Sequence, residues 1–250
     1  MNFPINITFS GVNIESHLVF ELLAYSIGFR YYLYLRKKQK DTISNENRLW
    51  IFIAAGLGGL IFSRILSALE DFPTFISSTT PFYYYYSNKT VLGGLLGGLI
   101  GVEITKKILK IKESSGDLMV YPLILGMMIG RVGCFLAGLE DGTYGTESNL
   151  PWAIDLGDGI YRHPTNLYEI LFLGLLWFIL VKLEKKYTFS NGSKFKLFLS
   201  SYLLFRFFAE FIKPVYKFTF GISSIQIACI LGLIYYYRVF IHPKELFETK

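Results

Sequence analysis

The chain has 250 residues and a formal net charge of +6; 52% of its residues are hydrophobic and only 18% are charged. The charged residues gather between long apolar runs, which is typical of a membrane protein with several spans and excludes an ordinary soluble domain. Because the lysines fall in the connections between these runs, the positive charge follows from membrane topology and does not indicate nucleic-acid binding.

Seven apolar segments approach the length of about 20 residues that a helix needs to cross a membrane. They cover residues 18–35, 49–69, 91–111, 118–139, 167–183, 195–212 and 222–240. The sequence therefore predicts an all-α membrane protein, in which residues 1–250 form a single domain of seven transmembrane helices. No Lys or Arg precedes Arg30, so we expect no cleavable signal peptide.

The connections between the segments predict the orientation. Lysine and arginine cluster after the first, third and fifth segments, whereas the other connections are poor in basic residues. Because basic connections stay in the cytoplasm, we expect the N-terminus outside and the C-terminus inside. The longest outer connection, residues 140–166, contains Asp-Gly and proline turn signals, so we expect it to form a small ordered cap over the outer face.

Glycines repeat every four residues in the third segment, at Gly93, Gly97 and Gly101. Rows of small residues allow two helix backbones to approach closely, so this segment is expected to pack tightly against a neighbour. The two cysteines, Cys134 and Cys229, lie inside apolar segments and have no metal-ligand spacing. We therefore expect neither a metal site nor a cofactor.

Arg131 is the most unusual residue of the fourth segment, because a guanidinium stays charged and is costly in hydrocarbon. It lies about eight residues from the outer end, which corresponds to a depth of roughly 12 Å. His17 and His242 fall at the membrane edges, so His163 is the only histidine expected near this depth. Other polar residues also fall in the outer half of their segments: Glu21, Arg64, Asn166, Tyr168, Glu169, Arg206, Glu210 and Gln226.

Two interpretations of these polar residues are open. In the first, they form a structural ion network in which Arg206 pairs with Glu210, and Arg131 pairs with Glu169 or Glu140. In the second, they line a polar cavity that opens to the outer leaflet and binds an anionic group, for which a lipid phosphate is the natural candidate. Burying several charges costs more than apolar packing would, so we favour the cavity.

Three motifs lie in the fourth to sixth segments: GRVGCF at residues 130–135, RHPTNLYE at 162–169 and FRFFAEFIKP at 205–214. In order and position they resemble the motifs of the prolipoprotein diacylglyceryl transferase family of the bacterial inner membrane. The resemblance implies transfer of a diacylglyceryl group from phosphatidylglycerol to the lipobox cysteine of a prolipoprotein. It also implies a multi-pass protein of the inner membrane whose partners are phosphatidylglycerol, lipobox-containing prolipoproteins and membrane lipids.

The resemblance further implies roles for individual residues. Arg131 and Arg206 match family arginines that would hold the leaving phosphate, and Glu169 and Glu210 match carboxylates that would orient them. His163 matches a family histidine and is either a base or a cap at the start of a helix. The remaining substrate-binding residues expected from this comparison are Glu21, Arg64, Gly93, Gly94, Cys134, Asn166, Tyr168 and Lys213.

The chain departs from the family pattern at five positions. Leu92 stands where the family usually has a histidine, Cys134 replaces an asparagine, Asn166 a glutamine, Lys213 an arginine and Glu21 a tyrosine.

These departures leave alternatives open. In an active transferase, another group such as His163, Glu21 or a substrate-bound water takes the proton of the substrate thiol. Two alternatives to an active transferase are a divergent relative that acts on another lipid or nucleophile, and a non-catalytic lipid-binding or transport protein. Cys134 is either a thiol activated by Arg131 or an inert residue that fills a gap.

Overall fold

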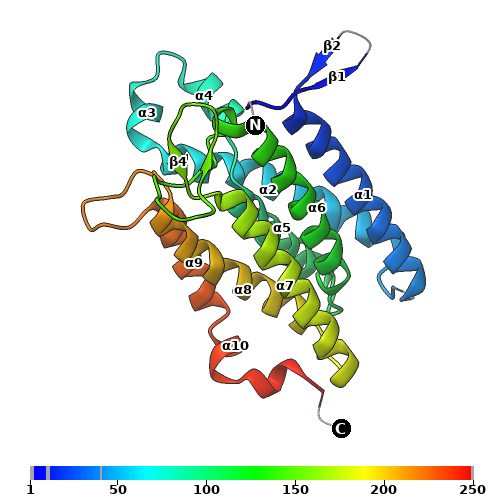
Figure 1. Ribbon diagram of the computed structural model, residues 1–250. Helices are drawn as coiled ribbons and strands as arrows, with labels where there is room; N and C mark the ends of the chain where they lie inside the picture. The colour runs from blue at the N-terminus through cyan, green and yellow to red at the C-terminus, as the bar shows by residue number, and fades with distance from the viewer. Residues whose placement is uncertain (1–2, 10–11, 40, 249–250) are drawn as a thin grey trace.

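The computed structural model describes residues 3–9, 12–39 and 41–248 and is mostly helical (Figure 1). Within these residues a helix lies over each of the seven apolar segments. These helices are α1 (Ser16–Lys38), α2 (Asn45–Glu70), α5 (Val91–Leu109), α6 (Val120–Ala137), α7 (Thr165–Lys186), α8 (Ser193–Ala209) and α9 (Ser224–Tyr235). By length and composition, three described stretches are able to cross a membrane: α2, α7 and residues 117–141 around α6. The fold is that of an all-α membrane protein.

Short elements connect the long helices. The strands pair as two antiparallel hairpins, and the remaining elements are single turns or short helices. They are β1 (Ile7–Phe9), β2 (Val12–Ile14), α3 (Phe72–Ser77), α4 (Pro81–Ser87), η1 (Asp117–Met119), η2 (Gly138–Asp141), β3 (Ile154–Asp155), β4 (Tyr161–Arg162), η3 (Glu210–Ile212), α10 (Arg238–Ile241) and η4 (Pro243–Leu246). Both hairpins, α3 and α4 gather at one end of the long helices, whereas α10 and the C-terminus lie at the other end (Figure 1).

Helix α8 supplies much of the core. Its side chains Phe198, Leu199, Tyr202 and Leu203 are fully buried and pack against apolar residues of α6, α7 and α9. By contrast, the outward faces of α1, α2 and α7 expose many large apolar side chains; Leu171, for example, is 71% exposed. A helix that buries one side and exposes apolar residues on the other is suited to lipid surroundings.

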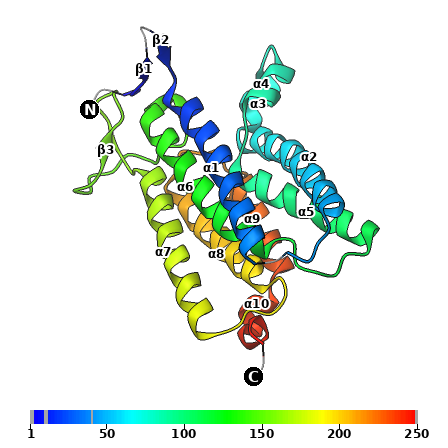
Figure 2. The ribbon, with the colours of Figure 1, turned by 90° about the vertical axis from the view of Figure 1, so that its right-hand side faces the viewer.

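Helices α2 and α5 form a close pair on one side of the molecule, with α7 on the opposite side (Figure 2). The glycine row of α5 lies directly on α2: a Cβ on Gly97 would collide with the carbonyl oxygen of Gly58, and one on Gly101 with that of Ala54. The expected close approach of the third segment is thus confirmed, and its partner is α2. Lack of side chains at these positions is what permits the backbone contact.

Polar side chains fix where several helices begin. Ser44 accepts a hydrogen bond from the backbone N–H of Asn47 at the start of α2, and Thr90 accepts one from Gly93 at the start of α5. Ser223 and Gln226 form a reciprocal capping box at the start of α9. Gln226 is therefore occupied by a structural role, although its position in the sequence placed it among the polar residues of the outer half.

A buried ion pair joins two connections at the end opposite to the hairpins. Arg48 donates two hydrogen bonds to the carboxylate of Asp41, at 2.6 and 2.7 Å, and a third to the carbonyl oxygen of Ser115 at 3.0 Å. Arg48 thus ties the connection between α1 and α2 to the connection between α5 and α6. The bidentate geometry satisfies both groups away from water.

The close pairing of α2 and α5 predicts the effect of adding one methyl group. In Gly97→Ala the new Cβ meets backbone atoms that cannot move aside, so we expect a loss of about 1–3 kcal/mol in the free energy of unfolding. Gly56→Ala on α2 is the matched control, because its Cβ would have no atom within 4 Å. Thermal unfolding in detergent measures both variants. Equal unfolding midpoints for the two would contradict the assignment of this contact.

Candidate functional site

Four buried charged residues from neighbouring helices form a continuous ion network, here called the arginine–glutamate cluster: Arg131, Glu169, Arg206 and Glu210. Glu169 lies at its centre, with Oε1 2.9 Å from Arg131 Nε and Oε2 3.7 Å from Arg206 Nη1. Arg206 Nη2 also lies 3.1 Å from Glu210 Oε2. None of these side chains is more than 8% exposed. Of the pairs in the ion-network interpretation, Arg206 with Glu210 is formed, and of the two partners left open for Arg131 the structure has Glu169.

Local geometry explains how the cluster is assembled. Arg206 and Glu210 are four residues apart, so they lie on the same face where α8 passes into η3. Tyr202, one turn before Arg206, donates a hydrogen bond of 2.9 Å to Glu169 Oε1. Arg131 projects from α6 and Glu169 from the second turn of α7, and these two helices pack against each other. The cluster therefore forms where α6, α7 and α8 meet.

The positive charge around the cluster exceeds what its two carboxylates neutralise. Lys213 follows η3 directly, is buried, and makes no salt bridge within the described part of the chain. Burial and the guanidinium groups of Arg206 and Arg131 lower the pKa of Lys213 to about 8. Two further charged residues, Glu70 at the end of α2 and Lys217, interact with the cluster through their electrostatic fields and form no salt bridge with it in the described structure. Their charges have opposite signs.

Glu210 also has a free acceptor. Its side chain is fully buried, yet Oε1 has no hydrogen-bond partner among the described residues. A buried acceptor without a donor is costly, so it indicates a place where a ligand hydroxyl or water belongs. With the surplus positive charge, the cluster is suited to an anion that carries hydroxyl groups.

The second motif is divided between the cluster and the preceding connection. The hydroxyl of Tyr168 accepts a hydrogen bond of 2.7 Å from Trp152 Nε1 and lies 3.2 Å from His163 Nδ1. Asn166 accepts one of 2.9 Å from the hydroxyl of Thr143. These contacts attach residues 143–163 to the start of α7. They give His163 an anchoring role, and no contact between His163 and the cluster is seen in the described structure.

Three of the expected substrate-binding residues lie on α2 and α5. Arg64 donates hydrogen bonds to the carbonyl oxygen of Leu60 and the hydroxyl of Ser63, and its guanidinium lies 5.3 Å from the centre of the Tyr86 ring. Gly93 packs on the backbone of Ser63, whereas Gly94 faces open space. Within the described residues, none of the three contacts the arginine–glutamate cluster.

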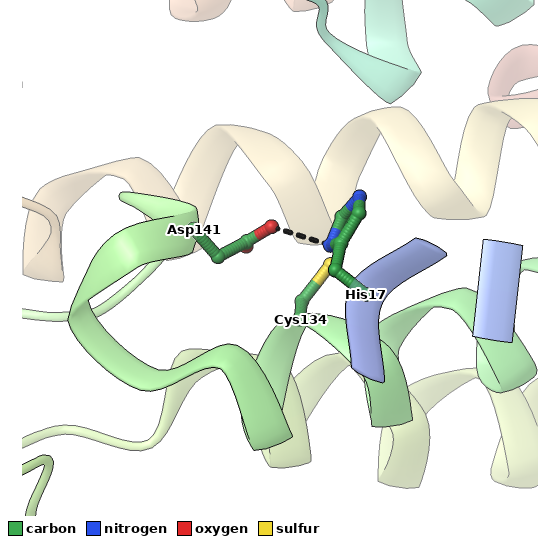
Figure 3. Close-up of side chains that lie close together, drawn as sticks. All are labelled: His17, Cys134 and Asp141. Carbon is green, nitrogen blue, oxygen red and sulfur yellow. Dashed lines mark ion pairs between the residues drawn. The ribbon is translucent and has the colours of Figure 1, made fainter. Parts of the chain in front are cut away.

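A second group of side chains meets beside Arg131, and it was not anticipated from the sequence. His17 at the start of α1, Cys134 on α6 and Asp141 at the end of η2 point toward one another (Figure 3). His17 Nδ1 lies 2.8 Å from Asp141 Oδ1, and Arg131 Nη1 lies 3.7 Å from Cys134 Sγ. The expectation that His163 is the only histidine at this depth is therefore wrong, because the packing of α1 on α6 brings His17 next to Cys134.

Glu21 belongs to this second group. One of its oxygens lies 3.7 Å from His17 Nε2, one turn earlier on α1, and the other pairs with Lys89. The sequence does contain a signal for part of the group, since Cys134 and Asp141 lie close together in the chain, where the fourth segment ends and the following connection begins. The addition of His17 depends on a long-range contact.

The chain is similar to known proteins over most of its length. The family model described as "prolipoprotein diacylglyceryl transferase" matches residues 4–242. A phosphatidylglycerol–prolipoprotein diacylglyceryl transferase of Pasteurella multocida is 30% identical over 178 residues, which cover 70% of this chain and 63% of that protein. The protein of the same name from Vibrio atlanticus is 31% identical over 206 residues, with coverages of 76% and 72%. One from Campylobacter hominis is 27% identical over 268 residues, with coverages of 99% and 93%.

The central position of Glu169 predicts a large effect on stability. In Glu169→Gln both arginines lose a buried carboxylate, so we expect the free energy of unfolding to fall by about 3–5 kcal/mol. Glu103→Gln is the control, because its side chain is 50% exposed and lies 4.0 Å from Lys106, a surface pair worth no more than about 1 kcal/mol. Thermal unfolding in the same detergent compares the two. A Glu169→Gln variant as stable as Glu103→Gln would show that the network is not structural.

Proposed function

Because the chain belongs to the prolipoprotein diacylglyceryl transferase family, whose members transfer a diacylglyceryl group from phosphatidylglycerol to a prolipoprotein, we propose that the arginine–glutamate cluster is the phosphate site of this reaction. One observation carries the proposal: two arginines are buried together around Glu169 with a third cation beside them. Such an arrangement matches a phosphate diester, which offers several acceptor oxygens and one negative charge.

The chemistry assigns a role to each member of the cluster. The sulfur of the substrate cysteine attacks the glyceryl carbon that carries the phosphate, the carbon–oxygen bond breaks, and glycerol phosphate leaves. Negative charge grows on the departing oxygen, where Arg131 and Arg206 stabilise it by charge-assisted hydrogen bonds. Glu169 holds both guanidinium groups in place before the reaction begins. Oε1 of Glu210, which has no partner among the described residues, accepts a hydrogen bond from a hydroxyl of the glycerol head group.

An apolar groove of about 220 Å³ is a suitable place for one acyl chain of the lipid. It is lined by Ile65, Ala68, Leu69, Phe72, Phe75 and Tyr85. Glu70, the residue after Leu69, interacts electrostatically with Glu210 and Lys213. A lipid with its head group at the arginines then has an apolar path for its tail between α2 and the short helices α3 and α4.

The same proposal includes the membrane arrangement. All seven long helices cross the inner membrane, the N-terminus is outside and the C-terminus is cytoplasmic, as the basic connections indicate. Both hairpins then lie at the outer end, opposite α10 (Figure 1). Residues 140–166 act as the cap, which Trp152, Tyr168 and His163 attach to α7. The lipobox cysteine of a prolipoprotein enters from this side.

Purified protein supplied with phosphatidylglycerol and a lipobox peptide tests the proposal, with the thioether product measured by mass spectrometry. Arg131→Ala and Arg206→Ala should each lower turnover by about 100- to 1,000-fold, because a donor to the leaving phosphate is lost. Arg238→Ala on exposed α10 is the control and should be unaffected. Unchanged turnover in both cluster variants would exclude the phosphate site. Bound lipid without product in the wild-type protein would favour a lipid-binding protein or a relative with another nucleophile.

Lys213 makes the reaction sensitive to pH. Because its pKa is lowered to about 8, its positive charge is present below that pH and is lost as the pH rises through it. We expect the KM for phosphatidylglycerol to increase above about pH 8 in the wild-type protein. Lys213→Arg keeps its charge at every accessible pH and should remove that increase. Comparing KM against pH for the two proteins separates this effect from ionisation of the substrate thiol, which both share; identical profiles would contradict the role of Lys213.

A further inference from the structure

The side chains of His17, Cys134 and Asp141 offer one nitrogen, one sulfur and one oxygen atom, all within 4.8 Å of one another (Figure 3). They come from α1, α6 and η2, so the fold brings together three chemically different ligands from separate elements. Cys134 is buried, whereas His17 remains one third exposed. The group therefore lies at the rim of the buried region, between the outer surface and the arginine–glutamate cluster.

Each of the three side chains is supported by a further polar residue. His17 Nδ1 faces Asp141, and its Nε2 lies 3.7 Å from the Glu21 carboxylate. The hydroxyl of Thr143 lies within hydrogen-bond distance of Asp141 Oδ2 as well as of Asn166, and Asp141 Oδ1 is directed at His17. Metal-binding histidines and carboxylates are usually oriented by a polar partner near the atom that does not bind the metal, and His17 and Asp141 each have a polar residue in that position.

Cys134 has a corresponding partner in Arg131. Arg131 Nη1 donates to Cys134 Sγ over 3.7 Å. This contact also connects the two sites, because the same guanidinium binds Glu169 through Nε. All three candidate ligands thus have an outer partner of the expected kind.

The donor set selects the metal. Thiolate sulfur disfavours magnesium and calcium, which take oxygen ligands, and a mixture of sulfur, nitrogen and carboxylate oxygen is typical of zinc. Zinc prefers four ligands in a tetrahedron, and structural sites fill all four with protein atoms. Three protein ligands leave the fourth position for water or a substrate atom, as in catalytic zinc sites.

We propose that His17, Cys134 and Asp141 bind a zinc ion whose fourth ligand is the sulfur of the substrate cysteine. This inference rests on the proposed transferase function and supplies its missing step, the ionisation of the thiol. A thiol loses its proton when it coordinates zinc, and the proton passes to solvent. The zinc-bound thiolate attacks the glyceryl carbon and forms the carbon–sulfur bond. The electron pair of the broken carbon–oxygen bond stays on the phosphate oxygen, and the zinc keeps its oxidation state.

The two sites are spaced for this displacement. Cys134 lies three residues after Arg131 on α6, so its Cα is about 4.5 Å further along the helix axis, toward the end of α6 that leads into η2. The nucleophile then approaches from the outer side while the phosphate is held on the inner side. A glyceryl carbon between them has its attacking and leaving atoms on opposite faces, as a direct displacement requires.

Four other residues of the site are not placed to take the proton of the substrate thiol. Glu169 bridges two arginines, His163 is in contact with Tyr168, and Leu92 is buried in the apolar core. Glu21, which was considered as a proton acceptor, faces His17 and Lys89 instead of the cluster. Activation of the thiol by a metal therefore agrees with the positions of all four residues.

Cobalt binding tests the metal site without any need for activity. Tag-free protein in detergent is depleted of metal with a chelator, titrated with Co²⁺, and followed by absorption spectroscopy. We expect one Co²⁺ per chain, with the intensity of a tetrahedral site and a thiolate-to-cobalt charge-transfer band. Cys134→Ser should abolish that band and His17→Gln should abolish tight binding, whereas Cys229→Ala, which removes the other cysteine, should retain both. Glu21→Gln should weaken binding by about 10-fold.

The outcomes separate this inference from the proposed function. Wild-type protein without the charge-transfer band, or with a band that Cys134→Ser retains, would overturn the zinc site. So would full transferase activity in metal-depleted protein, and in that case the transferase function itself would stand. Zinc bound with the expected stoichiometry in a protein that makes no thioether would support the site and refute the transferase function. Arg206→Ala, which lacks contact with the three ligands, should lose activity and keep its metal.

Discussion

The bridge that Glu169 forms between Arg131 and Arg206 is the interaction on which the rest of the structure depends. Three helices meet there, and each brings a charge that is tolerable away from water only if the other two are in place. This requirement fixes the relative positions of α6, α7 and α8 more strictly than apolar packing does, because leucines tolerate small shifts and a buried guanidinium does not. The bridge also presets the two arginines for an anion, so stability and the proposed catalysis have the same origin.

Arg131 links this bridge to the group formed by His17, Cys134 and Asp141. One part of its guanidinium binds Glu169, and another donates to Cys134, which lies beside His17 and Asp141. The proposed phosphate site and the proposed metal site then share one residue and one helix. In the proposed reaction the inner site holds the leaving group and the outer site holds the nucleophile, so the helical rise of α6 sets the distance between them. The connection attached to α7 by Trp152 and Tyr168 lies over this region.

The close pair of α2 and α5 has a different role. Glycine rows let the two backbones touch, so this pair has few side chains between its helices and leaves larger apolar residues on its outer faces. The C-terminal end of α2 continues into α3 and α4, and the apolar groove lies between α2 and these two short helices. In the proposed reaction the lipid tail lies on this side of the molecule, and the head group lies where α6, α7 and α8 meet.

The sequence by itself left the partner of Arg131 open between Glu169 and Glu140, but it determined the seven helical segments, the glycine contact and the pair Arg206–Glu210. These features depend on segment length, on residue spacing along one helix and on the cost of buried charge, all of which can be read locally. Only the tertiary structure decided that Arg64 turns to Tyr86, that His163 anchors a connection, and that His17 joins Cys134 and Asp141. The physical reason is that these neighbours come from the way one helix packs on another, which no periodicity within a single segment specifies.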